Sequence, residues 1–308
     1  FASHWPEAVD KMADEAIWMD SGNVLMQGDP KEITAKFMEG YTFEKTKTAD
    51  LGEPIISLKD AEKHFFSVVR GVVKAVDGVT FDIMEREVFG LVGKSGAGKT
   101  TTSRMVAGMT PATRGSVKIR IGDDWVDMSE VGPSGKGRAT PYIGFLHQEY
   151  TLYPFDNILS NLTTSIGARM PAELAKFKAI QVLQSVGFDK KNMESLLYSY
   201  PDTLSVGECQ RIAFAQVLIR EPRIIVLDEP TGTMDPITKT IIAKSVIKAR
   251  ETLGETFVVV SHDMDFVENV CDRVAFIRNG VVEDMGTPES VIQRFGLKEL
   301  QDDDSEGE

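Results

Sequence analysis

Three short, mostly apolar runs dominate the hydrophobic pattern of the chain. They cover residues 87–92, 224–229 and 256–260, and they are rich in branched side chains. Runs of this length without polar alternation are typical of strands that are buried on both faces of a parallel sheet. Polar and charged residues follow directly at the end of each run. The pattern therefore predicts an α/β fold in which candidate functional residues lie at the ends of adjacent strands.

A glycine-rich loop follows the first run. Lys99 and Thr100 end a segment that fits the phosphate-loop pattern G-x-x-x-x-G-K-[ST], whose glycines let backbone N–H groups point at phosphate oxygens. Lys99 is expected to neutralise the β- and γ-phosphates, and the Thr100 hydroxyl to ligate Mg²⁺. A helix over residues 99–107 would direct the positive end of its dipole at the phosphates. The predicted ATP-binding residues here are Gly93, Lys94, Ser95, Gly96, Ala97, Gly98, Lys99, Thr100 and Thr101.

Two adjacent carboxylates end the second run. Asp228 and Glu229 follow four apolar residues, and burying two carboxylates without a purpose would be costly. Asp228 is expected to hold Mg²⁺, directly or through water, and Glu229 to polarise an attacking water. Apolar strands that end in acids are common, so this motif is weak alone. Together with the phosphate loop it indicates a nucleoside-triphosphate hydrolase.

Residues 3–37 repeat residues 261–295 without a gap. Nine of the 35 aligned positions are identical, against roughly two expected by chance. The identities are Ser3/Ser261, His4/His262, Val9/Val267, Asp14/Asp272, Gly22/Gly280, Val24/Val282, Gly28/Gly286, Pro30/Pro288 and Phe37/Phe295. The second copy follows the predicted strand at residues 256–260. We therefore expect residues 1–40 to be the C-terminal remnant of a first domain of the same kind.

The repeat also sets the expected domain boundaries. Residues 41–54 are polar, lack helical or strand periodicity, and are expected to form a linker. Residues 55–297 are expected to form a complete second domain. Residues 298–308 are rich in acidic and small residues and are expected to be a disordered tail.

These motifs resemble those of the ABC-type ATPases, and further motifs follow in the family's order. Residues Leu204, Ser205, Val206, Gly207 and Glu208 resemble the family signature, except that valine stands at the third position, where the family has glycine. Through the resemblance, Gln148 is the expected Q-loop glutamine, which senses Mg²⁺ and water. Asp235 matches the D-loop, and His262 resembles the switch histidine that contacts the γ-phosphate.

Two further assignments rest on the same resemblance. Phe65 resembles the aromatic side chain on which adenine stacks, with Phe66 as an alternative. His4 aligns with His262 in the repeat, so it would be the switch histidine of the first domain.

The resemblance implies an architecture and a mode of action. The expected fold is a P-loop ABC ATPase domain with a RecA-like core of mixed, mostly parallel sheet, an antiparallel β subdomain and a helical subdomain. ABC domains hydrolyse ATP in a head-to-tail pair, in which the signature of one faces the phosphate loop of the other. The expected partner is thus the first ABC domain of the same full-length chain. Glu229, His262 and Gln148 are the expected catalytic residues, and Thr100, Gln148 and Asp228 the expected Mg²⁺ ligands.

Charge and cysteine content narrow the range of partners. The chain has 308 residues and a net charge of −13, and an acidic surface repels the phosphates of nucleic acids. Cys209 and Cys271 form no CxxC pair, which argues against an iron–sulfur cluster or structural zinc. Unpaired thiols fit a reducing, cytoplasmic compartment. No window approaches 18 consecutive apolar residues. We expect a cytoplasmic protein with no nucleic-acid partner.

Four segments resemble one group of ABC ATPases more closely. RIGDDWVDMSE, GRATPYIGFLHQEYTLYPF, RGVVKAVDGV and EPTGTMDPITK look like segments of the ATP-binding activation component of the methyl-coenzyme M reductase system of methanogenic archaea. The resemblance implies a soluble tandem ATPase that drives reductive activation of methyl-coenzyme M reductase. The expected partners are this reductase and its iron–sulfur-containing activation proteins, with no membrane partner.

Two other functions stay open at this level. The ATPase of an importer for peptides or nickel predicts a membrane permease partner and a glycine where Val206 stands. A translation or ribosome factor predicts a long charged linker and a basic surface, which the net charge of −13 argues against. An ABC repair ATPase would need zinc cysteines, which the sequence lacks.

Overall fold

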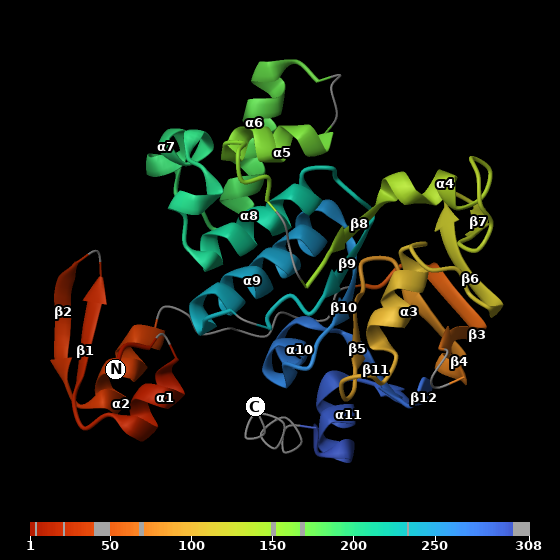
Figure 1. Ribbon diagram of the computed structural model, residues 1–308, viewed down its shortest axis with the longest axis horizontal. Coiled ribbons are helices and arrows are strands. Elements are labelled where there is room, and N and C mark those ends of the chain that lie inside the picture. The colour runs from red at the N-terminus through yellow and green to blue at the C-terminus, as the bar shows by residue number, and fades with distance from the viewer. Residues whose placement is uncertain are drawn as a thin grey trace.

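The computed structural model describes residues 1–3, 5–20, 22–39, 50–67, 71–148, 152–166, 170–232 and 234–297. Within these ranges a central sheet has six strands in the order β12-β11-β5-β10-β9-β8 (Figure 1). All neighbours pair in parallel except β12, which is antiparallel to β11. The strands are β5 (Val88–Val92), β8 (Ile143–Leu146), β9 (Ile224–Asp228), β10 (Thr256–Val260), β11 (Arg273–Arg278) and β12 (Val281–Gly286). The three apolar runs of the sequence thus form the adjacent strands β5, β10 and β9.

Side chains of the central strands alternate between two hydrophobic cores. In β10, Phe257 and Val259 belong to one core, whereas Val258 and Val260 belong to the other. Successive side chains of a strand point to opposite faces of the sheet, so a run that is apolar throughout needs a cover on both faces. Helices cover the first face, and a second sheet with α3 (Lys99–Val106) covers the other.

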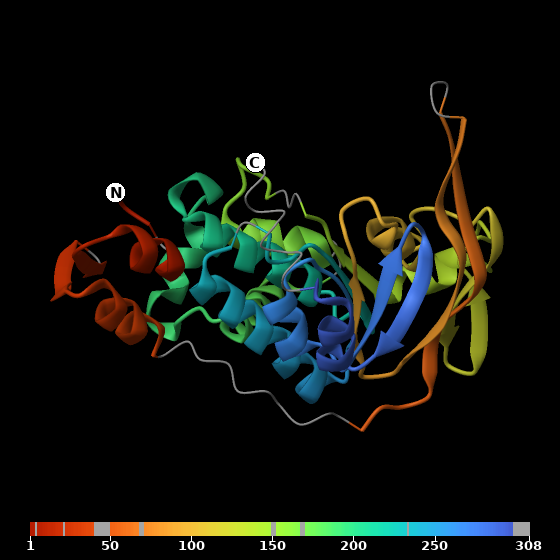
Figure 2. The same cartoon turned by 90° about the horizontal axis from the view of Figure 1, so that it is seen from below.

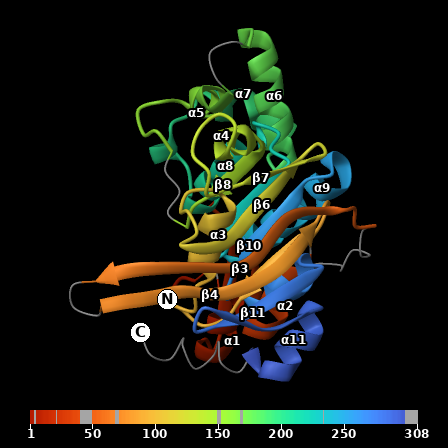
Figure 3. The ribbon, with the colours of Figure 1, turned by 90° about the vertical axis from the view of Figure 1, so that its right-hand side faces the viewer.

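The second sheet is antiparallel and has the strand order β4-β3-β6-β7. Its strands are β3 (Pro54–Ser67), β4 (Gly71–Met84), β6 (Arg114–Ile121) and β7 (Asp124–Asp127). The β3–β4 hairpin projects beyond the body of the molecule (Figures 2 and 3). β3 begins at Pro54, whose carbonyl accepts a hydrogen bond from Arg120 Nε at 2.8 Å. The expected linker therefore ends one residue earlier than its predicted bound.

The remaining helices form the expected helical part and the cover of the first face, except α4, which packs against the second sheet (Figure 1). They are α4 (Lys136–Ala139), α5 (Ile158–Ile166), α6 (Ala172–Ser185), α7 (Met193–Tyr198), α8 (Val206–Leu218), α9 (Pro236–Leu253), α10 (Met264–Val270) and α11 (Pro288–Phe295), with short 3-10 turns η1 (Thr140–Tyr142), η2 (Lys190–Asn192) and η3 (Pro201–Thr203). The mostly parallel core, the antiparallel sheet and the helical part of the expected fold are thus all present. Within the described ranges, no helix combines the length and the apolar character that crossing a membrane requires.

The first 38 residues contain the same succession of elements as the end of the domain. They form α1 (Pro6–Met12), β1 (Ala16–Asp20), β2 (Asn23–Gly28) and α2 (Pro30–Met38), which correspond to α10, β11, β12 and α11. Both hairpins change register at the aligned position, after Trp18 in β1 and after Phe276 in β11. Both also pack that ring on an aligned phenylalanine: Trp18 on Phe37 at 5.6 Å and Phe276 on Phe295 at 4.4 Å.

Some predicted features lie outside the described residues. They are the candidate switch residue His4, most of the expected linker (residues 41–49) and the acidic tail (residues 298–308).

Candidate functional site

The glycines of the phosphate loop are required by close backbone packing. Gly93, Gly96 and Gly98 have φ angles of 145°, 76° and 108°, which favour glycine. A Cβ at Gly93 would lie 2.2 Å from the Ile277 carbonyl oxygen, and one at Gly98 would lie 2.3 Å from the Ala75 oxygen. The loop is therefore enclosed between β11 and β4, and its conformation tolerates no side chain at these two positions.

Lys99 is buried inside this loop. Its Nζ donates hydrogen bonds to the carbonyls of Gly93 at 2.7 Å and Lys94 at 3.0 Å. Burial lowers the pKa of Lys99, and the nearby carboxylates of Asp228 and Glu229 act in the opposite direction. An ammonium within a ring of backbone groups at a helix N-terminus is suited to bind phosphate.

The other predicted loop residues differ in accessibility. The exposed ones are Lys94, Ser95 and Gly96, the half-buried ones Thr100 and Thr101, and the buried one Ala97. The residues at the tip of the loop are therefore exposed, whereas Ala97 behind the tip is buried.

Thr100 and Asp228 meet at the end of the central sheet. The Thr100 hydroxyl donates to Asp228 Oδ1 at 3.0 Å, although the two residues are far apart in sequence. Burial raises the pKa of Asp228, and the Thr100 hydrogen bond lowers it. A hydroxyl and a carboxylate are the oxygen ligands that Mg²⁺ uses beside nucleotide phosphates. The donor set therefore fits the predicted Mg²⁺ role of both residues.

Gln148 follows the edge strand of the central sheet. β8 pairs in parallel with β9, so the chain leaves β8 beside the end that carries Asp228. The neighbouring His147 lies near enough to act on the pKa of Asp228 and lower it. Gln148 is exposed. Its placement agrees with a position near the metal oxygens, and its role as a ligand stays a prediction.

Glu229 and His262 form a hydrogen-bonded pair at the ends of adjacent strands. β9 and β10 pair so that Asp228 lies opposite Val260, which places the residues after them side by side. His262 Nδ1 lies 2.7 Å from Glu229 Oε2, and this hydrogen bond raises the pKa of His262. Glu229 has a φ of 52°, a left-handed conformation that is costly for a non-glycine residue and that accompanies functional positions.

The candidate base-stacking residues lie on the β3–β4 hairpin. Phe65 is 45% exposed and Phe66 is 84% exposed. Lys63 Nζ lies 5.3 Å from the centre of the Phe65 ring, so one face of that ring is partly covered by its own strand. The hairpin also contributes the Ala75 carbonyl that packs on Gly98. Which of the two rings stacks on adenine stays a prediction.

The signature residues form the start of helix α8. Ser205 caps the helix through a reciprocal capping box with Glu208. Val206 is the first helical residue, and its side chain is 63% exposed. The departure from the family's glycine therefore adds an exposed apolar side chain without burying it in the domain. Leu204 packs at the edge of the hydrophobic core on the helical side of the sheet.

Gly207 joins the signature to the D-loop. A Cβ at Gly207 would lie 2.6 Å from the Thr238 hydroxyl. That hydroxyl donates to Asp235 Oδ2 at 2.6 Å, and Asp235 caps α9. The signature and the D-loop are thus one packed unit, in which glycine is the residue that fits.

Substituting Gly207 by alanine is expected to destabilise the domain by about 1–3 kcal/mol, because the added methyl group overpacks against Thr238. Val206→Ala is the matched control one residue earlier. Because Val206 is exposed, its truncation should change stability by no more than about 0.5 kcal/mol. Urea unfolding of both variants measures the difference, and equal stabilities would contradict the packing argument.

An ion pair connects this unit to the switch histidine. Lys239, in the first turn of α9, lies 2.6 Å from Asp263, the residue after His262. Lys239 Nζ also lies 5.3 Å from the centre of the Trp5 ring. The contacts therefore run from the signature through the start of α9 to the Glu229–His262 pair. Lys239 was not predicted as a functional residue, and no motif marks it, since its partner Asp263 lies 24 positions away.

The sequence and the fold of the chain match a known family. Residues 76–232 match the family described as ABC transporter. An uncharacterized ABC transporter ATP-binding protein of Methanocaldococcus jannaschii is 51% identical over 302 residues, which are 97% of this chain and 56% of that protein. The chain thus spans little more than half the length of this relative.

Other relatives have a stated function. A methionine import ATP-binding protein of Oceanobacillus iheyensis is 34% identical, covering 75% of this chain and 66% of its own length. One from Staphylococcus epidermidis is 32% identical, covering 81% and 73%. Among solved structures, a dimeric ATP-binding cassette in a post-hydrolysis state bound to ADP and Pi superposes with a TM-score of 0.66 at 26% identity, covering 76% of this chain and 99% of that chain.

Proposed function

This chain belongs to the ABC transporter ATP-binding family, and we propose that it uses ATP hydrolysis to close a head-to-tail pair of cassettes. ATP hydrolysis is the activity of the family. The observation that carries the proposal is the pair of contacts at the ends of neighbouring elements, Thr100 with Asp228 and Glu229 with His262. They support the proposal because Asp228, Glu229 and His262 lie together at the carboxyl ends of β9 and β10.

Each residue at this end of the sheet would have a separate role in hydrolysis. Lys99 and the loop N–H groups would bind the phosphates, and Thr100 and Asp228 would hold Mg²⁺. The cation, when bound, supplies charge neutralisation for the phosphate oxygens. Glu229 would orient the attacking water and accept its proton. His262 holds the Glu229 carboxylate in place, and its imidazole would also face the γ-phosphate.

The partner cassette of the pair, the first cassette, is proposed to be part of the same full-length protein. Residues 1–40 would be the end of that first cassette, and residues 55–297 the second one. The shared register shift and the shared ring contact of the two hairpins support this reading. The signature of residues 55–297 would then face the phosphate loop of the first cassette.

The 308-residue chain is expected to hydrolyse ATP at a rate per molecule that rises with protein concentration. The chain carries one phosphate loop and one signature, and a composite site needs two chains. Turnover measured over a wide range of protein concentration tests this, with sedimentation on the same samples. A rate per molecule that stays constant where the chain is monomeric would contradict the pairing.

The comparisons favour import across a membrane as the output of this ATPase. Two relatives with a stated function are methionine import ATP-binding proteins at 34% and 32% identity. This reading adds a membrane permease as the partner, in place of the expected absence of any membrane partner. Peptide or nickel, the substrates expected from the sequence for this alternative, are not supported by these relatives.

A second candidate output is ATP-dependent reductive activation of methyl-coenzyme M reductase. Its support is the resemblance of four sequence segments, two of which lie within residues 120–155. One relative that matches nearly the whole chain, at 51% identity, is an ABC transporter ATP-binding protein without a stated substrate, so it adds no support to this second output. The partners would then be the reductase and iron–sulfur activation proteins.

Purification of the tagged full-length protein from its native host, without oxygen, distinguishes the two outputs. Co-purification of an integral membrane permease supports import and rules out the reductase reading. Co-purification of methyl-coenzyme M reductase with redox proteins has the opposite meaning. A Glu229→Gln variant that still drives the output at the normal rate would separate that output from hydrolysis at this site.

A further inference from the structure

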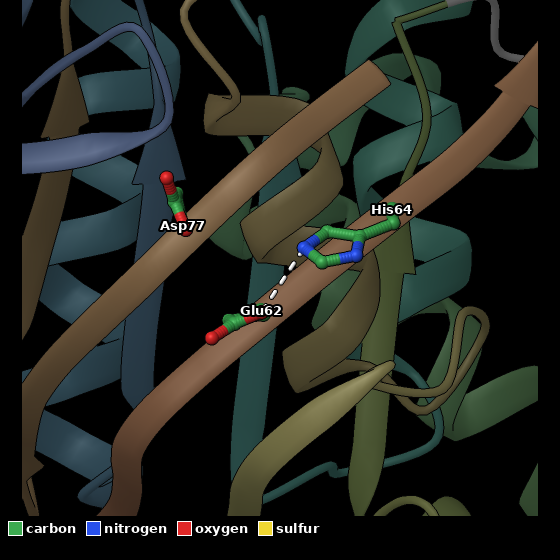
Figure 4. Close-up of side chains that lie close together, drawn as sticks. All are labelled: Glu62, His64 and Asp77. Carbon is green, nitrogen blue, oxygen red and sulfur yellow. Dashed lines mark ion pairs between the residues drawn. The ribbon is translucent and has the colours of Figure 1, made fainter. Parts of the chain in front are cut away.

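Three side chains of the types that can ligate a metal lie close together on the β3–β4 hairpin (Figure 4). They are Glu62 and His64 of β3 and Asp77 of β4, and each is partly buried. One ligand atom from each side chain lies within 4.8 Å of the others. His64 Nε2 lies 3.0 Å from Glu62 Oε2. None of these residues belongs to the ATP site described above.

We propose that Glu62, His64 and Asp77 bind a divalent transition-metal cation of the Zn²⁺ or Co²⁺ type. One imidazole nitrogen and two carboxylate oxygens form a mixed donor set. Such a set suits these cations better than Mg²⁺ or Ca²⁺, which take oxygen ligands, or Cu⁺, which takes sulfur. Three protein ligands leave the fourth tetrahedral position for water.

The state of the His64 ring supports a ligand role. Its Nε2 atom is buried from solvent and makes no hydrogen bond. The 3.0 Å approach to Glu62 therefore lacks the directionality of a hydrogen bond. Ligand atoms around a tetrahedral Zn²⁺ lie about 3.3–3.6 Å apart, given bonds of about 2.0–2.2 Å. The spacing of the imidazole and the carboxylate is thus already close to that of two ligands sharing one cation.

The backbone holds the three residues in place before any cation binds. Thr113 N donates to the Glu62 carbonyl at 2.7 Å, and His64 N donates to the Thr113 hydroxyl at 3.0 Å. One threonine therefore fixes the two β3 ligands relative to each other. Asp77 N donates to the Gly280 carbonyl at 2.9 Å. Because these hydrogen bonds already hold the three residues in place, less conformational entropy is lost when a cation binds.

Lys74 would compete with a cation for one of the three ligands, Asp77. Its Nζ donates to both Asp77 carboxylate oxygens, at 3.0 and 3.2 Å. The Lys74 side chain is 53% exposed, and ion pairs at exposed positions contribute little. A divalent cation in the cluster would therefore displace the ammonium, which can turn into solvent.

The proposal is tested by titrating Co²⁺ into the tag-free 308-residue chain in excess Mg²⁺, which fills sites made of oxygen alone. Calorimetry gives the affinity and the visible spectrum gives the ligand geometry. We expect one saturable site with a tetrahedral or five-coordinate spectrum. His64→Asn, Glu62→Gln and Asp77→Asn should each weaken binding by more than about tenfold, the lower end of what even outer-shell changes cost. Glu194→Gln, an exposed carboxylate elsewhere, is the matched control and should bind as the parent does.

Several outcomes would overturn the site. One is the absence of saturable binding, and another is an unchanged affinity in His64→Asn. A sulfur-to-cobalt charge-transfer band would assign the metal to Cys209 instead. Unchanged affinity in Asp77→Asn alone would reduce the proposal to a two-residue contact and contradict the three-ligand site. Circular dichroism of each variant confirms that the fold is kept, so a loss of affinity is a loss of ligands.

Discussion

Glu229→Gln is expected to lower ATP turnover by about a hundred- to ten-thousand-fold while leaving ATP binding nearly unchanged. The amide keeps the shape of the side chain but cannot accept a proton from water. Lys99, Thr100 and Asp228, which would bind the phosphates and Mg²⁺, keep their contacts. Steady-state turnover and equilibrium binding of a fluorescent ATP analogue, both with the paired protein, measure the two effects.

The structure offers a control and an independent readout for this variant. Glu173→Gln changes an exposed carboxylate on α6 and should leave turnover unchanged. The pKa of His262 is raised mainly by its hydrogen bond to Glu229, so it should fall in Glu229→Gln, where the partner carries no charge. NMR titration of the imidazole follows this. Undiminished turnover, with the pKa of His262 lowered as expected, would show that another group activates the water.

Glu255→Gln is expected to stabilise the fold at pH 8 and to leave its stability at pH 4.5 nearly unchanged. Glu255 is 3% exposed, and neither carboxylate oxygen has a hydrogen-bond partner. Burial, with a smaller contribution from Glu221, raises its pKa from 4.5 to about 7. The residue lines a cavity of about 420 Å³ whose other charged groups are Glu85, Arg86, Glu221 and Arg223. An ionised carboxylate at this position is therefore a cost to the folded state.

The sign of the pH dependence follows from the proton uptake of the two states. Between pH 4.5 and about 7 the folded chain holds a proton on Glu255 that the unfolded chain has lost. The contribution of Glu255 to the stability of the folded state therefore falls as the pH rises through that window. The full difference corresponds to about 3 kcal/mol, and we expect about 1–3 kcal/mol of it to appear as added stability of the glutamine variant at pH 8.

Urea unfolding at a series of pH values measures this effect. The parent should lose stability relative to Glu255→Gln across the window, and the two curves should meet near pH 4.5. Glu221→Gln is the informative comparison, since removing the second cause of the raised pKa should move the window to slightly lower pH. Parallel curves for parent and Glu255→Gln would mean that the carboxylate is not the source of the pH dependence.

The elements that rest on short-range patterns were predictable from the sequence. The runs at residues 224–229 and 256–260 form β9 and β10, because an uninterrupted branched run is favourable only in a strand covered on both faces. The glycines at 93 and 98 occupy left-handed conformations, as their spacing before Lys99 predicts. The deviations are small. Strand β5 begins at Val88 instead of residue 87, and α3 ends at Val106 instead of residue 107.

The order of the strands could not be read from these patterns. An apolar run indicates that a strand is buried, but it does not indicate which strand lies beside it. The pairing of β10 with both β5 and β9 places His262 beside Glu229 and Asp228 beside Thr100. The motifs predicted a separate role for each of these residues. The packing of the strands is what brings their side chains into contact.

Periodicity, glycine spacing and chain order act within a few residues, so the local elements, the loop that suits phosphate and the types of residue available for chemistry were predictable without a structure. Contacts between residues far apart in the chain were not predictable in this way. These include the Lys239–Asp263 ion pair, the convergence of Glu62 and His64 with Asp77, and the burial of Glu255 without a partner. Such contacts depend on the register and packing of whole elements, which are set by the sum of many weak interactions rather than by any one motif.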